Sequence, residues 1–174
     1  IDKYFMLPSG CHCSNEFLID DDYMQSVETC DVTDYTWAMS YLLDATADGT
    51  YADKIETCIF NAGIGTVLED FKGLQYFSCA NQILADYQSN HNAFHKGTSW
   101  MSYRPNPGTE CCPGNVNRFM PNFVLNSWRQ KEDKLYSYLY APTTLETEVK
   151  GEKVTICEET NYPFEEGAVY KIRT

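Results

Sequence analysis

The sequence predicts a fold that is mostly α-helical at its start and β-stranded at its end. Two observations predict this order. Apolar residues recur at helical spacing in residues 31–49, 50–71 and 113–130, and period-two alternation takes over after Lys131. Helices followed by strands favour two structural units, with a junction near residues 132–134. We therefore expect one unit over residues 1–132 and a second over 133–174.

Two helices are expected in the first half. In residues 31–49 the apolar stripe comprises Tyr35, Met39, Leu42 and Leu43. Asp31 or Thr33 can cap the start of this helix, and Gly49 can end it. In residues 50–71 the stripe comprises Ile55, Cys58, Ile59 and Ala62. Gly63 and Gly65 then indicate close packing against a neighbour or an early helix end.

The remaining elements follow from local composition. Residues 1–27 carry turn formers and an acidic run, so we expect irregular or extended chain there. Residues 74–84 resemble a strand, and residues 86–110 form a long polar loop. Pro113 suits the first turn of a helix running to about Gln130. Strands are expected in 135–149, 152–164 and 168–174, separated by Lys-Gly-Glu and Glu-Glu-Gly turns.

Composition limits the class of protein. With 174 residues, 43% of them hydrophobic and 14% aromatic, the chain can bury a core. A net charge of -12 disfavours nucleic acid and anionic membranes as partners. No apolar run approaches the roughly 20 residues that span a bilayer. Ile1 in place of Met predicts a processed product or a piece of a longer chain, and the compartment (cytoplasmic, or periplasmic and secreted) stays open.

The chain contains eight cysteines. They are Cys11, Cys13, Cys30, Cys58, Cys79, Cys111, Cys112 and Cys157. Four disulfides in a secreted binding domain are one interpretation, although such frameworks mainly serve small domains with poor cores. We favour metal ligation together with buried free thiols, with Cys58, Cys79 and Cys157 in the core.

The tripeptide Glu-Thr-Cys occurs twice, and only one copy can bind an ion. Residues i and i+2 of an extended segment project to the same side, so Glu28 and Cys30, just before a helix, can share a ligand. Inside a helix the same spacing separates side chains by about 200°, so Glu56 and Cys58 cannot.

Glu28 and Cys30 therefore combine with the adjacent pair Cys111 and Cys112 as a candidate zinc site. Zn²⁺ accepts thiolate sulfur and carboxylate oxygen in tetrahedral geometry. A helix start beside Cys111 and Cys112 would favour the thiolates. The run Cys11-His12-Cys13 is a rival donor cluster.

Several motifs resemble the β-L-arabinofuranosidase family, glycoside hydrolase family 127 and its relatives. They are "SNEFL", "SVETC", "YADKIETCIFNAGIGTVLEDF", "GTECCPGNVNRFMPNF", "KLYSYLYAPTTLE" and "ETNYPFEEG", in the family's order and over nearly the whole chain. The resemblance implies the last part of an (α/α)6 barrel over 1–132, followed by the first strands of a β-sandwich over 133–174.

The resemblance also implies roles for individual residues. Glu28, Cys30, Cys111 and Cys112 match the zinc ligands, and Cys111 matches the nucleophile of these retaining enzymes. Glu16 matches the general acid/base, and Tyr76 or a near neighbour matches a substrate-contacting tyrosine. Asn115 and Arg118 also match the motif, and both residues can equally serve helix capping and a structural ion pair.

The implied substrate is an arabinose-containing oligosaccharide or glycoconjugate. Because the family's earlier barrel helices lie outside this chain, we expect the rest of a longer chain or another copy to cover its open apolar face. A non-catalytic, zinc-stabilised fragment or carbohydrate-binding module is the alternative function. His91 and His95 of the polar loop can line a sugar site or be solvated.

Overall fold

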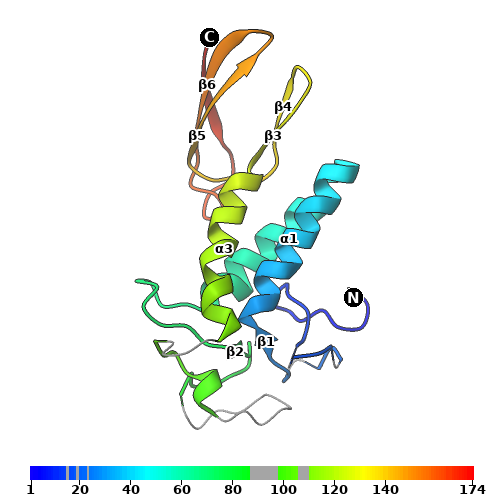
Figure 1. The fold of residues 1–174 in the computed structure, drawn as a ribbon, viewed down its shortest axis with the longest axis vertical. Coiled ribbons are helices and arrows are strands. Elements are labelled where there is room, and N and C mark those ends of the chain that lie inside the picture. The colour runs from blue at the N-terminus through cyan, green and yellow to red at the C-terminus, as the bar shows by residue number, and fades with distance from the viewer. Residues whose placement is uncertain (15, 19, 23, 87–97, 106–109) are drawn as a thin grey trace. The chain divides into compact units, whose positions relative to one another are not determined.

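The computed structural model describes residues 1–14, 16–18, 20–22, 24–86, 98–105 and 110–174. Within these ranges three α-helices are followed by small antiparallel sheets (Figure 1), as the sequence predicts. The chain divides into two compact units, Ile1–Pro121 and Asn122–Thr174. The predicted domain junction at residue 132 stays a prediction. In these ranges no helix has both the length and the apolar character needed to cross a bilayer.

The first helix, α1 (Thr29–Thr46), begins two residues earlier than the sequence predicts. Glu28 occupies the N-cap position, so the prediction of Asp31 or Thr33 as the cap is wrong. The helix starts there because the chain leaves strand β1 (Val27–Glu28) at that residue. It ends at Ala47, whose left-handed backbone directs its N–H to the carbonyl of Leu43.

Half of the buried side chains of α1 are threonine or serine. Its buried side chains are Thr29, Cys30, Val32, Thr33, Tyr35, Thr36, Ser40 and Leu43. Thr36 Oγ1 donates to the carbonyl of Val32 at 2.7 Å, which lets such a residue lie in a core without a lost hydrogen bond. The predicted apolar stripe is correct for Tyr35 and Leu43 but wrong for Leu42, which is 40% exposed.

The second helical segment combines helix α2 (Thr50–Thr57) with the π-helix η1 (Cys58–Gly63). All four residues of its predicted stripe are buried, as expected. A Cβ on Gly63 would lie 3.3 Å from Cγ1 of Val32 and 3.5 Å from Cε2 of Phe119. The predicted close packing at Gly63 is confirmed, and it brings this segment against α1 and the third helix.

Only two residues of the predicted strand at 74–84 pair with another strand. They form β2 (Phe77–Ser78), which pairs antiparallel with β1 through Val27↔Ser78 and Glu28↔Phe77. The predicted long loop contains a 3₁₀ helix, η2 (Thr98–Met101), while residues 87–97 and 106–109, including His91 and His95, lie outside the described residues.

Helix α3 (Cys111–Asn126) places Pro113 in its first turn, as predicted. It ends four residues before Gln130, so the expected end of this helix is wrong. The chain instead forms β3 (Trp128–Lys131), which pairs with β4 (Lys134–Ser137) as an antiparallel hairpin. The strand Trp128–Lys131 contains one apolar residue, so no apolar period marks where the helix ends and the strand begins.

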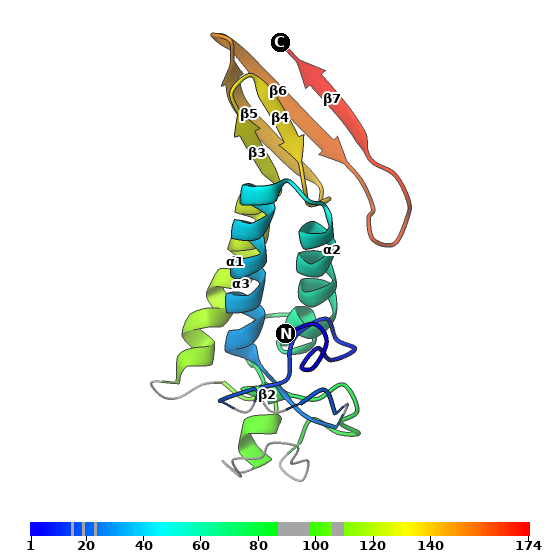
Figure 2. The same ribbon diagram turned by 90° about the vertical axis from the view of Figure 1, so that its right-hand side faces the viewer.

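The second unit also contains a three-stranded antiparallel sheet in the order β5 (Thr143–Val149), β6 (Glu152–Glu159) and β7 (Val169–Arg173), visible in Figure 2. Lys150 and Gly151, with φ of 55° and 82°, join β5 to β6. Positive φ at both central residues is typical of a type I′ hairpin turn. The predicted Lys-Gly-Glu turn is confirmed.

One buried carboxylate connects the strands of this second unit. Glu158 of β6 is 1% exposed. It accepts hydrogen bonds from Thr143 Oγ1 at 3.3 Å and from the Tyr170 hydroxyl at 3.4 Å. Trp128 Nε1 donates in turn to Thr143 Oγ1 at 3.1 Å. Desolvation by burial raises the pKa of Glu158 above its ordinary value of 4.5, although these donors oppose the shift.

Glu158 therefore predicts a specific pH dependence of stability. Because the folded chain holds this proton more tightly than the unfolded chain does, the contribution is fully present below the ordinary pKa and is lost as pH rises through the folded one. Urea unfolding from pH 7 to pH 4 should show the wild type gaining stability relative to Glu158→Gln as pH falls. Glu146→Gln, an exposed carboxylate of β5, controls for the loss of one charge. A constant wild-type-to-Glu158→Gln difference across this range would contradict the prediction.

Candidate metal centre

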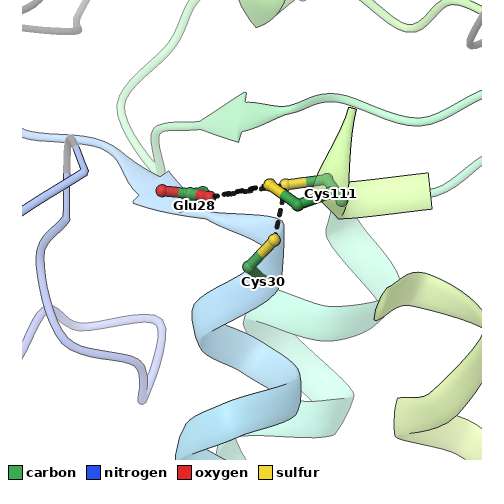
Figure 3. A group of neighbouring side chains, drawn as sticks. Glu28, Cys30 and Cys111 are labelled. Carbon is green, nitrogen blue, oxygen red and sulfur yellow. Dashed lines mark hydrogen bonds between the residues drawn. The ribbon is translucent and has the colours of Figure 1, made fainter. Parts of the chain in front are cut away.

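Two helix starts and one short strand pairing bring the predicted donor side chains together. Glu28 ends β1, and Cys30 lies in the first turn of α1. Cys111 and Cys112 open α3. Figure 3 shows Glu28, Cys30 and Cys111 converging from these three places. The two cysteine segments are 82 residues apart in sequence, and the Cys30–Cys112 contact joins them.

The donor atoms are close enough to bind one ion. One donor atom from each of Glu28, Cys30, Cys111 and Cys112 lies within 4.8 Å of the others. The Sγ atoms of Cys30 and Cys112 are 3.2 Å apart. Glu28 Oε1 accepts from the thiols of Cys111 at 3.6 Å and Cys112 at 3.7 Å. Three sulfurs and one carboxylate oxygen are a donor set that Zn²⁺ accepts.

The cluster is enclosed on one side and open on the other. Glu28 is 5% exposed, Cys30 is 8% exposed and Cys112 is fully buried, whereas Cys111 is exposed. Within the described ranges, no Lys, Arg or His forms an ion pair with Glu28. A carboxylate buried among thiols without such a partner suits a bound cation, because buried charges are paired or coordinate metals.

The electrostatics of the thiols point the same way. Burial raises the pKa of Cys112 well above its ordinary value, and the neighbouring Cys30 raises it further. Burial also raises the pKa of Cys111 to about 11. A hydrogen bond from Cys112 lowers the pKa of Cys30. Thiolates at Cys111 and Cys112 therefore need a compensating positive charge, and a coordinated metal ion supplies one.

The predicted catalytic residues meet at the open side, around the buried Tyr76. The Tyr76 hydroxyl donates to Glu16 Oε1 at 3.2 Å and lies 3.0 Å from Cys111 Sγ. Burial and then Cys111 raise the pKa of Tyr76, so the hydroxyl keeps its proton. Glu16 is exposed and has a φ of 74°, which is uncommon for a residue other than glycine. The fold thus places Glu16, Tyr76 and Cys111 together.

The rival cysteine clusters do not form a comparable donor group. Among the residues that the structure describes, Glu28, Cys30, Cys111 and Cys112 are the one group of three or more donors close enough to hold an ion. Cys11 is buried and hydrogen-bonded to Cys58, while His12 Nδ1 lies 3.4 Å from the carbonyl of Cys13. All eight cysteines are free thiols, which disfavours the interpretation as a disulfide-rich domain.

Asn115 and Arg118 have the structural contacts that the sequence allows. Arg118 forms an ion pair of 3.5 Å with Asp34 and lies over the ring of Trp37 at 5.0 Å. Asn115 accepts at its carbonyl from Thr33 Oγ1 at 3.0 Å. These contacts join α1 to α3, the two helices whose first turns carry the thiols.

Sequence reasoning missed the residues that support the site. Arg104 donates to both carboxylate oxygens of Glu110, at 2.8 and 2.9 Å, and so fixes the residue that precedes Cys111. The ring of Trp100 lies 3.9 Å from that of Tyr76 between centroids. The adjacency of Glu110 to the cysteine pair was the one available signal, whereas no spacing rule connects Trp100 or Arg104 to the site.

Comparisons with known proteins agree with this geometry. The family model described as "Beta-L-arabinofuranosidase, GH127 catalytic domain" matches residues 10–124. Among solved structures, a GH127 β-L-arabinofuranosidase from Geobacillus stearothermophilus T6 is similar with a TM-score of 0.79 and 24% identity, covering 98% of this chain and 27% of that one. No curated protein matches the chain.

Two further solved structures show the same likeness. A GH127 β-arabinofuranosidase gives a TM-score of 0.77 at 22% identity, covering 97% of this chain and 25% of its own. A protein described as a glycoside hydrolase gives 0.79 at 19%, covering 98% and 31%. The chain thus spans about a quarter to a third of the length of these proteins.

The donor set predicts one bound zinc per chain. Elemental analysis by plasma mass spectrometry should find close to one equivalent in the wild type and a large loss in Cys112→Ala, which removes the fully buried ligand. Cys157→Ala, on β6 of the other unit, is the matched control and should keep its zinc. Equal zinc content in Cys112→Ala and the wild type would remove Cys112 from the site.

Proposed function

The chain belongs to the family of β-L-arabinofuranosidase GH127 catalytic domains, and from this membership we propose that it supplies the catalytic groups of a retaining glycoside hydrolase. The proposed reaction releases L-arabinofuranose, or a related sugar, from an oligosaccharide or glycoconjugate. Cys111 is the proposed nucleophile and Glu16 the proposed general acid/base. The observation that carries the proposal is their common contact with the Tyr76 hydroxyl, beside the Glu28 and cysteine cluster.

The spacing of the two groups supports retention of configuration. Cys111 Sγ and Glu16 Oε1 cannot lie further apart than their two contacts with Tyr76 combined. In inverting enzymes the two carboxyl groups are at least about 6.5 Å apart, and in retaining enzymes they are about 5–5.5 Å apart. The upper limit for Cys111 and Glu16 is shorter than the inverting distance. The gap therefore suits direct attack by Cys111 better than an intervening water.

The proposed first step uses both residues at once. Cys111 Sγ attacks the anomeric carbon and forms a carbon–sulfur bond while the bond from that carbon to the leaving oxygen breaks. Glu16 donates its proton to the leaving oxygen. Zinc held by Glu28, Cys30, Cys111 and Cys112 would keep the sulfur of Cys111 ionised at neutral pH.

The second step returns the residues to their starting state. Glu16, now a carboxylate, takes a proton from a water molecule whose oxygen attacks the anomeric carbon. The carbon–sulfur bond breaks and Cys111 leaves as a thiolate, so the sugar is released with its original configuration. Tyr76 keeps its proton throughout and orients both groups by hydrogen bonding.

The partial coverage of the solved relatives supports the wider fold as a proposal. We propose that the helices form the last part of an (α/α)6 barrel and the sheets the first strands of a β-sandwich. α1 exposes Trp37, Tyr41 and Leu42, an apolar surface that further helices of such a barrel, or another copy of the chain, would cover. Residues that select the sugar would then come partly from those helices.

Because the chain spans only part of its solved relatives, a non-catalytic zinc-binding module is a second candidate function. A chain that spans 27% of the Geobacillus enzyme could bind zinc for structure and lack catalysis of its own. Zinc content together with hydrolysis of a chromogenic β-L-arabinofuranoside divides the two candidates. Zinc with turnover supports the hydrolase, and zinc without turnover by the chain supports the structural module.

The nucleophile assignment predicts the result of Cys111→Ser. A serine hydroxyl is far less nucleophilic than a thiolate and is a poorer zinc ligand, so hydrolysis of the chromogenic substrate should fall by about 10³-fold or more. Cys79→Ser, outside the cluster, should hydrolyse the substrate at the wild-type rate. Near-normal turnover by Cys111→Ser would reject Cys111 as the nucleophile.

The acid assignment predicts a dependence on the leaving group. A general acid contributes about 10²–10⁴-fold, and mainly when the departing oxygen is basic. Glu16→Gln should therefore slow release of an alkyl or sugar alcohol far more than release of nitrophenol. An equal loss for both substrates would indicate that Glu16 has another role.

A further inference from the structure

Thr29 is the middle residue of the Glu-Thr-Cys motif, and both of its donors point at one segment. Its side chain is fully buried. Its backbone N–H donates to the carbonyl of Tyr76 at 2.9 Å, and its Oγ1 donates to the carbonyl of Gln75 at 2.7 Å. Its two neighbours in sequence, Glu28 and Cys30, both belong to the metal cluster.

The opposite side of the same segment is also fixed. Gln75 Nε2 donates to the carbonyl of Met101 at 2.6 Å and to Gln82 Oε1 at 2.8 Å. The backbone N–H of Tyr76 donates to the carbonyl of Trp100 at 3.0 Å. The segment Gln75–Tyr76 therefore lies between Thr29 and η2, with hydrogen bonds on both sides.

This segment reaches the reacting groups through Tyr76. The hydroxyl of Tyr76 contacts Glu16 and Cys111, as described above. Its backbone carbonyl, which accepts from Thr29, also lies 3.9 Å from Cys112 Sγ. A shift of the segment would thus move the tyrosine at both ends relative to the thiols.

We propose that Thr29 is a positioning residue that holds Tyr76 in register with the metal ligands. Its hydroxyl ties the tyrosine segment to the turn that carries Glu28 and Cys30. The β1–β2 pairing holds Phe77 and Ser78, the two residues that follow the segment. The hydrogen bonds of Thr29 extend this anchoring to Gln75 and Tyr76, where the segment meets the site. This role rests on the proposed function, because it acts through the zinc ligands and Cys111.

Threonine suits the position because of two properties. The hydroxyl gives a second donor beside the backbone N–H, and the branched Cβ restricts χ1, so the donor stays aimed at its acceptor. Serine keeps the hydroxyl with a freer rotamer, and valine keeps the branched shape without the donor. The pair Thr29→Ser and Thr29→Val therefore separates hydrogen bonding from packing.

The test measures the metal site directly. Zinc affinity is obtained by competition with a chromophoric chelator, and the thiolate-to-Co²⁺ absorption band reports ligand geometry after cobalt substitution. Thr29→Val should bind zinc about 10–100-fold more weakly, the range for loss of an outer hydrogen bond at a metal site, and should shift the cobalt band. Thr29→Ser should restore both to near the wild-type values.

A matched control comes from the same helix. Thr36 is also a buried threonine of α1, but its hydroxyl donates within the helix, to the carbonyls of Val32 and Thr33. Thr36→Val should leave zinc affinity and the cobalt spectrum unchanged. An equal loss in Thr36→Val would mean a general stability effect and would overturn the proposal.

A double-mutant cycle tests whether Thr29 acts through the tyrosine. If it does, Thr29→Val combined with Tyr76→Phe should weaken zinc binding no more than the larger single change does. Fully additive losses would overturn the proposal. If Thr29→Val does not fold, Thr29→Ala against Thr29→Ser gives the same comparison, since neither carries the methyl group and only serine keeps the donor.

The outcomes separate this proposal from the proposed function. If the wild type binds zinc and Thr29→Val has the same zinc affinity and cobalt spectrum, the metal site is supported and the role of Thr29 is rejected. A wild-type chain that binds neither zinc nor cobalt rejects the metal site and the role of Thr29 together.

Discussion

The mutual repulsion of four anion-forming side chains is the constraint on which the site depends. Glu28, Cys30, Cys111 and Cys112 place their donor atoms within 4.8 Å of one another, three of them in largely buried positions. Ionised together they repel, and burial strengthens that repulsion because the local dielectric is low. A divalent cation converts the same closeness into attraction. The helix starts, the β1–β2 pairing and the hydrogen bonds of Thr29 hold these donors close together against that repulsion.

Helix starts provide part of that frame. Cys30 lies in the first turn of α1, and the cysteine pair opens α3. The first-turn N–H groups and the positive end of each helix dipole favour negative charge there. Glu28 stands at the N-cap of α1, yet its side chain makes no capping hydrogen bond and its carboxylate accepts from the thiols instead. The residue at the cap position thus belongs to the donor cluster, while β1–β2 pairing and Thr29 hold the turn.

The sequence was informative where one local rule decides the geometry. The i, i+2 argument predicted that Glu28 and Cys30 lie together, and they do. Its premise of an extended segment was wrong for Cys30, which lies in the first turn of α1. Turn residues located the Lys150–Gly151 hairpin. The rules failed for the buried face of α1, because threonine and serine satisfy their hydroxyls on the backbone and so enter a core without an apolar pattern.

The long-range contacts of the site had no periodic signal. Glu16, Tyr76 and Cys111 meet across separations of 60 and 35 residues, through one hydroxyl. Spacing rules describe neighbours on one element and cannot show which loop passes beside which helix. The resemblance to a known family pointed to these three residues, whereas their common contact and the hydrogen bonds of Thr29 are visible only in the folded structure.

The adjacency of Cys111 and Cys112 suits the proposed role of Cys111 as a metal-bound nucleophile. Successive residues of a helix point about 100° apart, so two neighbouring thiols can belong to one cluster and still differ in their exposure to solvent. Cys112 is fully buried against Cys30, where it can hold an ion but cannot meet a substrate. Cys111 is exposed, and it lies beside Tyr76. A single cysteine at this helix start would be either a buried ligand or an accessible nucleophile. With two cysteines in succession, Cys112 can bind an ion from the buried side while the sulfur of Cys111 faces the side where Glu16 lies.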